Sequence, residues 1–189
     1  MKKMYMAMKF KRDKSKERLE DQLEMDLRSQ LLRDKSLIVI PTHPSIPNTD
    51  IIYNGPFYCE SAGDSGSITC TDCNIIVSEE LKALDESGVF FCYLDDRFSA
   101  GTIVELMYCA MKKVPTYIVY KKKETKYKVE SEYWFAIVAA TQLNPKTYVK
   151  GIDRDLDYYT LREIIKSIDK NLEWVTLYER KTTVDKGEM

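Results

Sequence analysis

The chain has 189 residues, of which 44% are hydrophobic and 31% charged, a composition typical of a folded domain and unlike that of disordered chains. Its formal net charge is −1, so we expect no general electrostatic attraction to nucleic acid or to an anionic membrane. No apolar run has the length of a membrane span, and the N-terminus lacks the pattern of a signal peptide. These features predict a cytoplasmic protein.

The first third of the chain predicts an added helix that precedes most of the sheet strands in the sequence. Residues 1–14 are basic and rich in methionine without a clear period, so we expect a loose segment there. A single domain is expected over 15–180, with a loose tail over 181–189. Within 15–34 leucine recurs at every fourth position, which is typical of an amphipathic helix: Leu19, Leu23, Leu27 and Leu31. This helix either packs on the domain's own sheet or forms a homodimer or higher homo-oligomer.

The rest of the chain alternates short apolar runs with helical periods. Strands are expected at 36–40, 50–53, 89–94, 116–120 and around 147–149, and helices at 79–86, 102–112, 131–142 and 159–170. Ser78 is expected to cap the first helix of that set. Alternating strands and helices predict an α/β fold: one domain with a mostly parallel sheet and helices on both faces, of flavodoxin-like or Rossmann-like type.

The most informative segment follows the apolar run at 89–94. Residues 99–105 (SAGTIVE) end a loop and begin a helix, which is where open α/β sheets bind ligands. A helix N-terminus there favours an anion. Glu105 lies about one turn into the helix, so its carboxylate can face the ligand as a reacting group. The alternative is a first-turn glutamate that only complements the helix dipole.

Three segments together resemble the nucleoside 2-deoxyribosyltransferases and the related nucleoside 5′-monophosphate N-glycosidases. They are residues 53–57 (YNGPF), residues 99–105 (SAGTIVE) and residues 107–115 (MYCAMKKVP), and the resemblance covers roughly residues 50–120. It implies a small-molecule nucleoside or nucleoside 5′-monophosphate as substrate, cleavage or exchange of its N-glycosidic bond, and no metal or organic cofactor.

The resemblance assigns catalytic roles to two glutamates. Glu105 matches the family's nucleophile at the anomeric carbon, and a carboxylate there would capture an oxocarbenium-like state. Glu80 matches the position of the family's second acid, which is usually an aspartate, so its carboxylate lies one methylene further out. The alternative for Glu80 is a solvent-facing helix charge.

The resemblance also implies a substrate-binding set. The monophosphate hydrolases carry serine at the position of Ser99, where the transferases carry aspartate, and a serine hydroxyl with helix N–H groups suits a 5′-phosphate. Gly55 would let the base approach the backbone. Either Asp95 and Asp96 point to solvent, or one of them takes over the role of holding a sugar hydroxyl. The full set is Asn54, Gly55, Pro56, Phe57, Asp96, Ser99, Gly101 and Thr102.

Two observations keep other interpretations open. The family has a helix and a strand between the Gly-Pro motif and the second acid, whereas residues 57–77 are too short and polar for both. The elements at 15–34 and 36–40 would fill those places in permuted order, or the sheet is built differently and the chain is a nucleotide-binding module without turnover. Cys70 and Cys73 have the spacing of half a zinc site, which Cys59 and His43 would have to complete; otherwise they are loop thiols.

Overall fold

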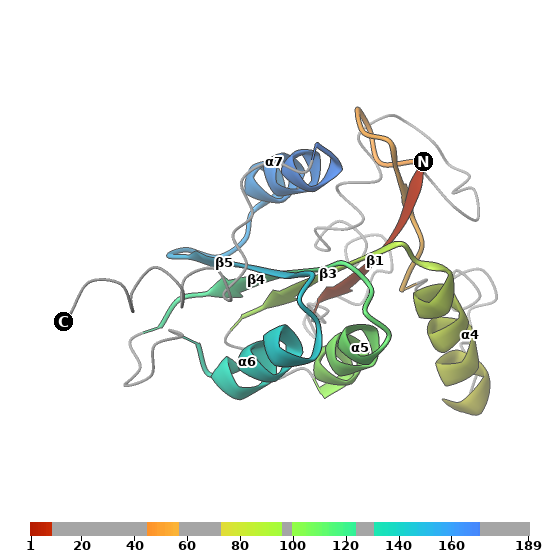
Figure 1. The fold of residues 1–189 in the computed structure, drawn as a ribbon. Coiled ribbons are helices and arrows are strands. Elements are labelled where there is room, and N and C mark those ends of the chain that lie inside the picture. The colour runs from red at the N-terminus through yellow and green to blue at the C-terminus, as the bar shows by residue number, and fades with distance from the viewer. Residues whose placement is uncertain (9–44, 57–72, 96–99, 124–130, 171–189) are drawn as a thin grey trace, which may run out of the picture.

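The computed structural model describes residues 1–8, 45–56, 73–95, 100–123 and 131–170 (Figure 1). These residues form one sheet of five strands, all parallel, in the order β2-β1-β3-β4-β5. The strands are β1 (Lys2–Met8), β2 (Ile51–Tyr53), β3 (Val89–Leu94), β4 (Thr116–Lys121) and β5 (Thr147–Ile152). The helices are α4 (Cys73–Glu86), α5 (Ala100–Met111), α6 (Trp134–Leu143) and α7 (Tyr158–Asp169).

Strand β1 corrects the expectation of a loose N-terminal segment for residues 2–8, while residues 9–14 of that segment lie outside the described residues. It lies inside the sheet, paired with β2 on one side and with β3 on the other. Met4 and Met6 are fully buried on one face of the sheet, and Tyr5 is fully buried on the other. A strand that is buried on both faces of a parallel sheet has no alternation of polar and apolar residues, so its sequence lacks the period that marks an exposed strand.

Most of the other expected elements are confirmed, with small shifts at their ends. The strands expected at 50–53, 89–94, 116–120 and 147–149 correspond to β2, β3, β4 and β5. Helix α4 begins at Cys73 rather than near residue 79, so Ser78 lies inside the helix and is not its cap. The expected helix at 15–34, the expected strand at 36–40 and the tail at 181–189 lie outside the described residues.

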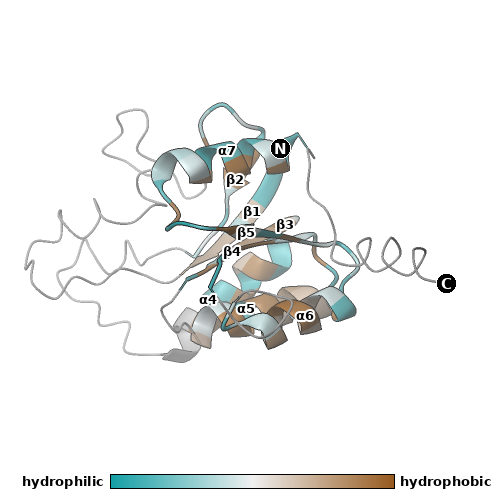
Figure 2. Cartoon of the chain, turned by 90° about the vertical axis from the view of Figure 1, so that its left-hand side faces the viewer, coloured by the Kyte–Doolittle hydropathy of each residue, from teal (hydrophilic) through white to brown (hydrophobic). Residues whose placement is uncertain are grey.

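Helices cover both faces of the sheet, as the sequence predicted. Figures 1 and 2 show α4, α5 and α6 on one side of the strands and α7 on the other. The chain passes from β2 to β3, β4 and β5 in one direction across the sheet, and right-handed crossovers then place the three connecting helices on one face. Each face has its own apolar core, around Phe90, Leu106 and Ile137 on the α4–α6 side and around Phe91 and Ile165 on the α7 side.

The strand order places a topological switch point between β1 and β3. The chain leaves β1 for β2 on one side and later returns to β3 on the other side. In open α/β sheets ligands bind next to such a point, and the order found here is the flavodoxin-like one. Among the helices in the described ranges, none is long and apolar enough to cross a membrane.

Candidate active site

The two glutamates singled out in the sequence meet at one tyrosine. The phenol oxygen of Tyr5 lies 2.5 Å from Glu80 Oε2 and 2.7 Å from Glu105 Oε1. The three residues come from β1, α4 and α5, and they lie beside the switch point between β1 and β3. The structure thus brings Glu105 and Glu80 together at Tyr5, a residue that the sequence analysis did not include.

Packing fixes the ring of Tyr5 under the two acids. The tyrosine is fully buried, whereas both glutamates are only half-buried. Its ring stacks on that of Phe90 in the neighbouring strand, with 6.0 Å between the ring centroids. The phenol thus has a fixed position, and the two carboxylates can reach it while remaining partly accessible.

The environment keeps the phenol of Tyr5 protonated. Burial raises the pKa of Tyr5 far above its usual value, and the nearby charges of Glu105 and Glu80 raise it further. A phenol has one proton and can donate it to only one carboxylate at a time. Both short contacts are satisfied together when one glutamate is ionised and the other is protonated and donates to the phenol oxygen. The cluster can thus hold one acid and one base side by side.

The spacing of the acids also limits the chemistry. Because both carboxylate oxygens lie within hydrogen-bond distance of the same atom, they are no more than about 5 Å apart. Retaining glycosidases separate their two carboxyl groups by roughly 5–5.5 Å, and inverting enzymes by roughly 6.5–9.5 Å to leave room for a water. The upper bound on the separation of the two oxygens lies nearer the retaining range than the inverting one.

Gly55 packs against the ring of Tyr5. Its φ is +112°, and a Cβ built on it would lie 3.0 Å from Tyr5 Cε2 and 3.1 Å from Tyr5 Cδ2. Only glycine adopts this backbone conformation without strain, and only glycine leaves space for the ring. The structure therefore gives Gly55 a packing role beside the acids. The sequence analysis expected a different role for Gly55, that of letting a base approach the backbone.

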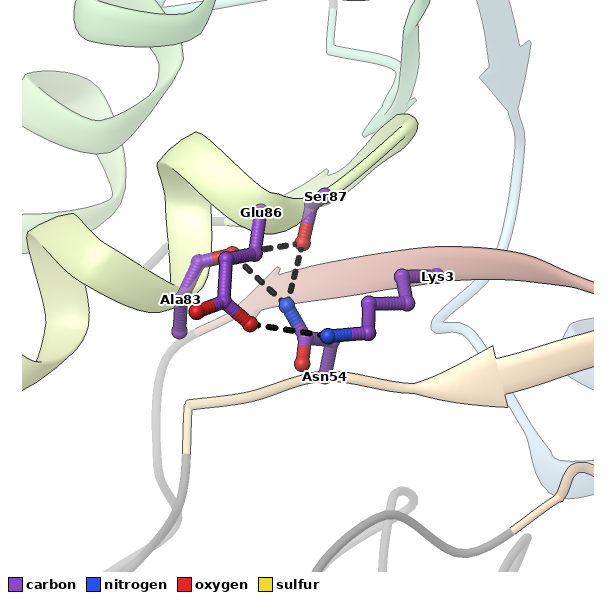
Figure 3. Close-up of polar contacts among 5 residues, drawn as sticks. All are labelled: Lys3, Asn54, Ala83, Glu86 and Ser87. Atoms are coloured by element: carbon purple, nitrogen blue, oxygen red, sulfur yellow. Dashed lines mark hydrogen bonds and ion pairs between the residues drawn. The ribbon is translucent and has the colours of Figure 1, made fainter.

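Asn54 joins the end of β2 to α4 (Figure 3). Its side chain is fully buried, and its amide nitrogen donates to the carbonyl of Ala83 at 2.7 Å and to Ser87 Oγ at 2.9 Å. The hydroxyl of Ser87 donates to the same carbonyl at 2.7 Å. Beside these bonds, Lys3 forms an ion pair with Glu86 at 2.8 Å. The contacts of the Asn54 amide nitrogen anchor α4 rather than face a ligand.

Of the other expected binding residues, some lie within the described ranges and some lie outside them. Gly101 and Thr102 lie in the first turn of α5, where Gly101 is exposed and a Cβ built on it meets nothing within 4 Å, while Thr102 is buried. Pro56 is half-buried, and its carbonyl accepts a hydrogen bond from Tyr53 Oη at 2.6 Å. Three expected residues lie outside the described residues: Phe57, Asp96 and Ser99.

Two of the described cysteines belong to the core, and Cys73 is the first residue of α4. Cys92 and Cys109 are free and fully buried. Burial, and next the charge of Glu105, raises the pKa of both thiols, that of Cys109 to about 12, so neither is a reactive thiolate near neutral pH. Within the described ranges no group of three or more His, Cys, Asp or Glu residues is placed to hold a metal ion. His43, Cys59 and Cys70 lie outside those ranges.

Sequence reasoning missed Tyr5. The signal was the apolar run at 4–8 preceded by two lysines, which has the length and flanks of a buried strand. Comparison with known proteins adds no assignment: no protein-family model matches the chain, and no curated protein shows significant similarity to it.

Proposed function

We propose that this protein breaks the N-glycosidic bond of a nucleoside or nucleoside 5′-monophosphate by a double displacement at the anomeric carbon. The observation that supports this most directly is the contact of Tyr5 Oη with both Glu80 and Glu105. The cluster supplies a carboxylate and a proton donor within about 5 Å, which are the two groups that a retaining glycosidic mechanism needs. The resemblance of residues 99–105 to the deoxyribosyltransferases and N-glycosidases supports the proposed substrate class.

In the first step, a carboxylate oxygen of Glu105 forms a bond to the anomeric carbon. The bond between that carbon and the base nitrogen breaks, and its electron pair goes to the base. Glu80, in its protonated form, gives the base its proton and becomes the ionised member of the cluster. In the second step a water, or a second base, attacks the anomeric carbon and releases the carboxylate of Glu105. The ionised Glu80 takes the proton that the attacking group loses and so returns to its starting form.

Tyr5 holds the two acids in their different roles. Its phenol donates to whichever glutamate is ionised, and its oxygen accepts from whichever is protonated. When Glu80 releases its proton, the phenol hydrogen bond can turn towards Glu80 without moving a heavy atom. A phenylalanine at this position would keep the ring packing and lose this function.

The test is a panel of nucleosides and nucleoside 5′-monophosphates, followed by chromatography for the free base. The wild-type protein should release base from some members, and Glu105→Gln should be slower by roughly 100-fold or more because it removes the nucleophile's charge. Glu79→Gln is the matched control, since Glu79 is an exposed neighbour of Glu80 on the same helix. Failure to release base from any member, or a normal rate in Glu105→Gln, would contradict the proposal.

Added free bases separate the two possible acceptors. Formation of a new nucleoside indicates transfer, release of the base alone indicates hydrolysis, and binding without release identifies a module without turnover. Ser99, which precedes the first residue of α5 in the sequence, supports a preference for a 5′-phosphate, because a serine tolerates an anion that an aspartate would repel. Monophosphates should be favoured over nucleosides by roughly 10- to 100-fold in kcat/KM, and Ser99→Asp should remove that preference.

A further inference from the structure

A second polar cluster links α4 to α5 beyond the two acids. Tyr108 Oη donates to Asp85 Oδ1 at 2.9 Å, and Lys112 Nζ lies 3.1 Å from the same oxygen. Lys112 Nζ also lies 5.2 Å from the centroid of the Tyr108 ring. Asp85 belongs to α4, Tyr108 to α5, and Lys112 immediately follows α5. One carboxylate oxygen therefore has two partners on the neighbouring helix.

The register of α5 connects this cluster to the nucleophile. Glu105, Tyr108 and Lys112 are spaced i, i+3 and i+7, and residues so spaced lie along one side of a helix. The side of α5 that presents Glu105 to Tyr5 is thus the side that binds Asp85. At 1.5 Å per residue, the two links between the helices are roughly 5–8 Å apart along their axes.

Other polar contacts of α4 hold it to the sheet. Asn54 and Lys3 hold the C-terminal end of α4 to β2 and β1, as Figure 3 shows. Apolar side chains of the two helices share one core, which includes Ala83 of α4 and Leu106 of α5. The contacts of Asp85 with Tyr108 and Lys112 add polar links between the helices, whereas Glu80 and Glu105 meet through Tyr5.

We propose that Asp85, Tyr108 and Lys112 form a positioning cluster that sets the separation of α4 and α5, and so the placement of Glu80 and Glu105 on Tyr5. The proposal rests on the function proposed above. These three residues act through the helices and do not touch the substrate. The hydrogen bond from Tyr108, and next Lys112, lowers the pKa of Asp85, so the link is ionised and complete at neutral pH.

The first test observes Tyr5 directly and needs no substrate. Protein labelled with ¹³C at the tyrosine Cζ is examined by NMR, and the Tyr5 signal is assigned by its loss in Tyr5→Phe. Tyr108→Phe removes one hydroxyl from a half-exposed ring, and it should shift the Tyr5 signal because the phenol's contacts change. Tyr159→Phe is the control, since Tyr159 is 75% exposed on α7, and it should leave the signal in place. An unchanged Tyr5 signal in Tyr108→Phe would overturn the proposal.

The second test measures the reaction. Tyr108→Phe should lower kcat by about tenfold with little change in KM, because small displacements of reacting groups slow chemistry more than binding. In a Glu80→Gln background the same change should have a smaller effect on kcat, since the proton donor whose placement relative to Glu105 it disturbs is already absent. Equal effects in both backgrounds would show that Tyr108 acts elsewhere. If no substrate is turned over, the proposed function fails, while the NMR test still decides whether the cluster positions the acids.

Discussion

Replacing Gly55 by alanine tests the packing under the candidate site. The glycine has a φ of +112°, in a region that residues with a side chain rarely adopt. The added Cβ would lie 3.0 Å from a ring carbon of Tyr5, closer than unstrained contacts allow. That ring cannot withdraw easily, because it is fully buried and stacked on Phe90. The substitution must therefore strain the backbone, displace the ring, or do both.

The magnitude follows from these two costs. Backbone strain at a glycine-only conformation costs about 1–3 kcal/mol, and overpacking a rigid site costs about 1–3 kcal/mol more. The smaller conformational freedom of alanine in the unfolded chain offsets about 0.4–1 kcal/mol. We expect Gly55→Ala to lose roughly 2–5 kcal/mol of stability. For a domain of this size the melting temperature should fall by roughly 5–15 °C.

Two other glycines provide matched controls in a thermal melt followed by circular dichroism. Gly101→Ala places its Cβ in open space within α5, so its melting temperature should stay the same or rise, because alanine favours a helix by about 1 kcal/mol. Gly151→Ala meets the ends of the Tyr120 and Lys122 side chains, which can move, so its loss should be small. A melting temperature of Gly55→Ala within about 2 °C of wild type would refute the reasoning.

Two further results are expected from the polar contacts. In urea unfolding, Asn54→Asp should destabilise the protein by about 1–3 kcal/mol more than Asn54→Ala, because it places a buried carboxylate against the carbonyl to which the amide donated. Lower pH should reduce the difference in stability between the two variants. Equal urea midpoints for the two variants would contradict this prediction. Asp157 caps α7 by accepting from the backbone N–H of Thr160 at 2.7 Å, a bond that lowers the pKa of Asp157. The contribution of this bond to stability is fully present above the pKa of Asp157 in the unfolded chain, about 3.9, and is lost as the pH falls through its lower pKa in the folded protein. The melting temperature of Asp157→Ala should thus be a few degrees below that of wild type at neutral pH, and the two should converge in acid. A difference in melting temperature that stays constant across that pH range would show that it does not come from the charge of Asp157.

The fold was predictable where apolar runs are bounded by clear breaks. Strand β3 is a run of six apolar or aromatic residues, and its expected bounds agree with those in the structure. Strand β1 was not predicted, because its short run of Met, Tyr and Ala shows no alternation and stands next to lysines. The start of α4 was placed too late, because Ser78 has the properties of a cap and yet lies within the helix. Local signals identify such elements only when their ends and periods are distinct.

The site was predictable in part. Glu105 stands in a recognisable context of strand, loop and helix, and Glu80 followed from the resemblance alone. Their meeting at Tyr5 depends on packing between segments 75 and 100 residues apart in the chain, which no local pattern encodes. The same holds for Gly55, whose role depends on a ring brought to it by β1.

The position of β1 in the sheet has a consequence during synthesis on the ribosome. Met4 pairs with Val89, about 85 residues further along the chain, so one edge of β1 has no partner until β3 has been made. At about 5–20 residues per second this interval lasts roughly 4–17 s, far longer than a local hairpin takes to form. Throughout it the nascent chain carries a run of apolar side chains with an open hydrogen-bonding edge, the kind of segment that chaperones bind.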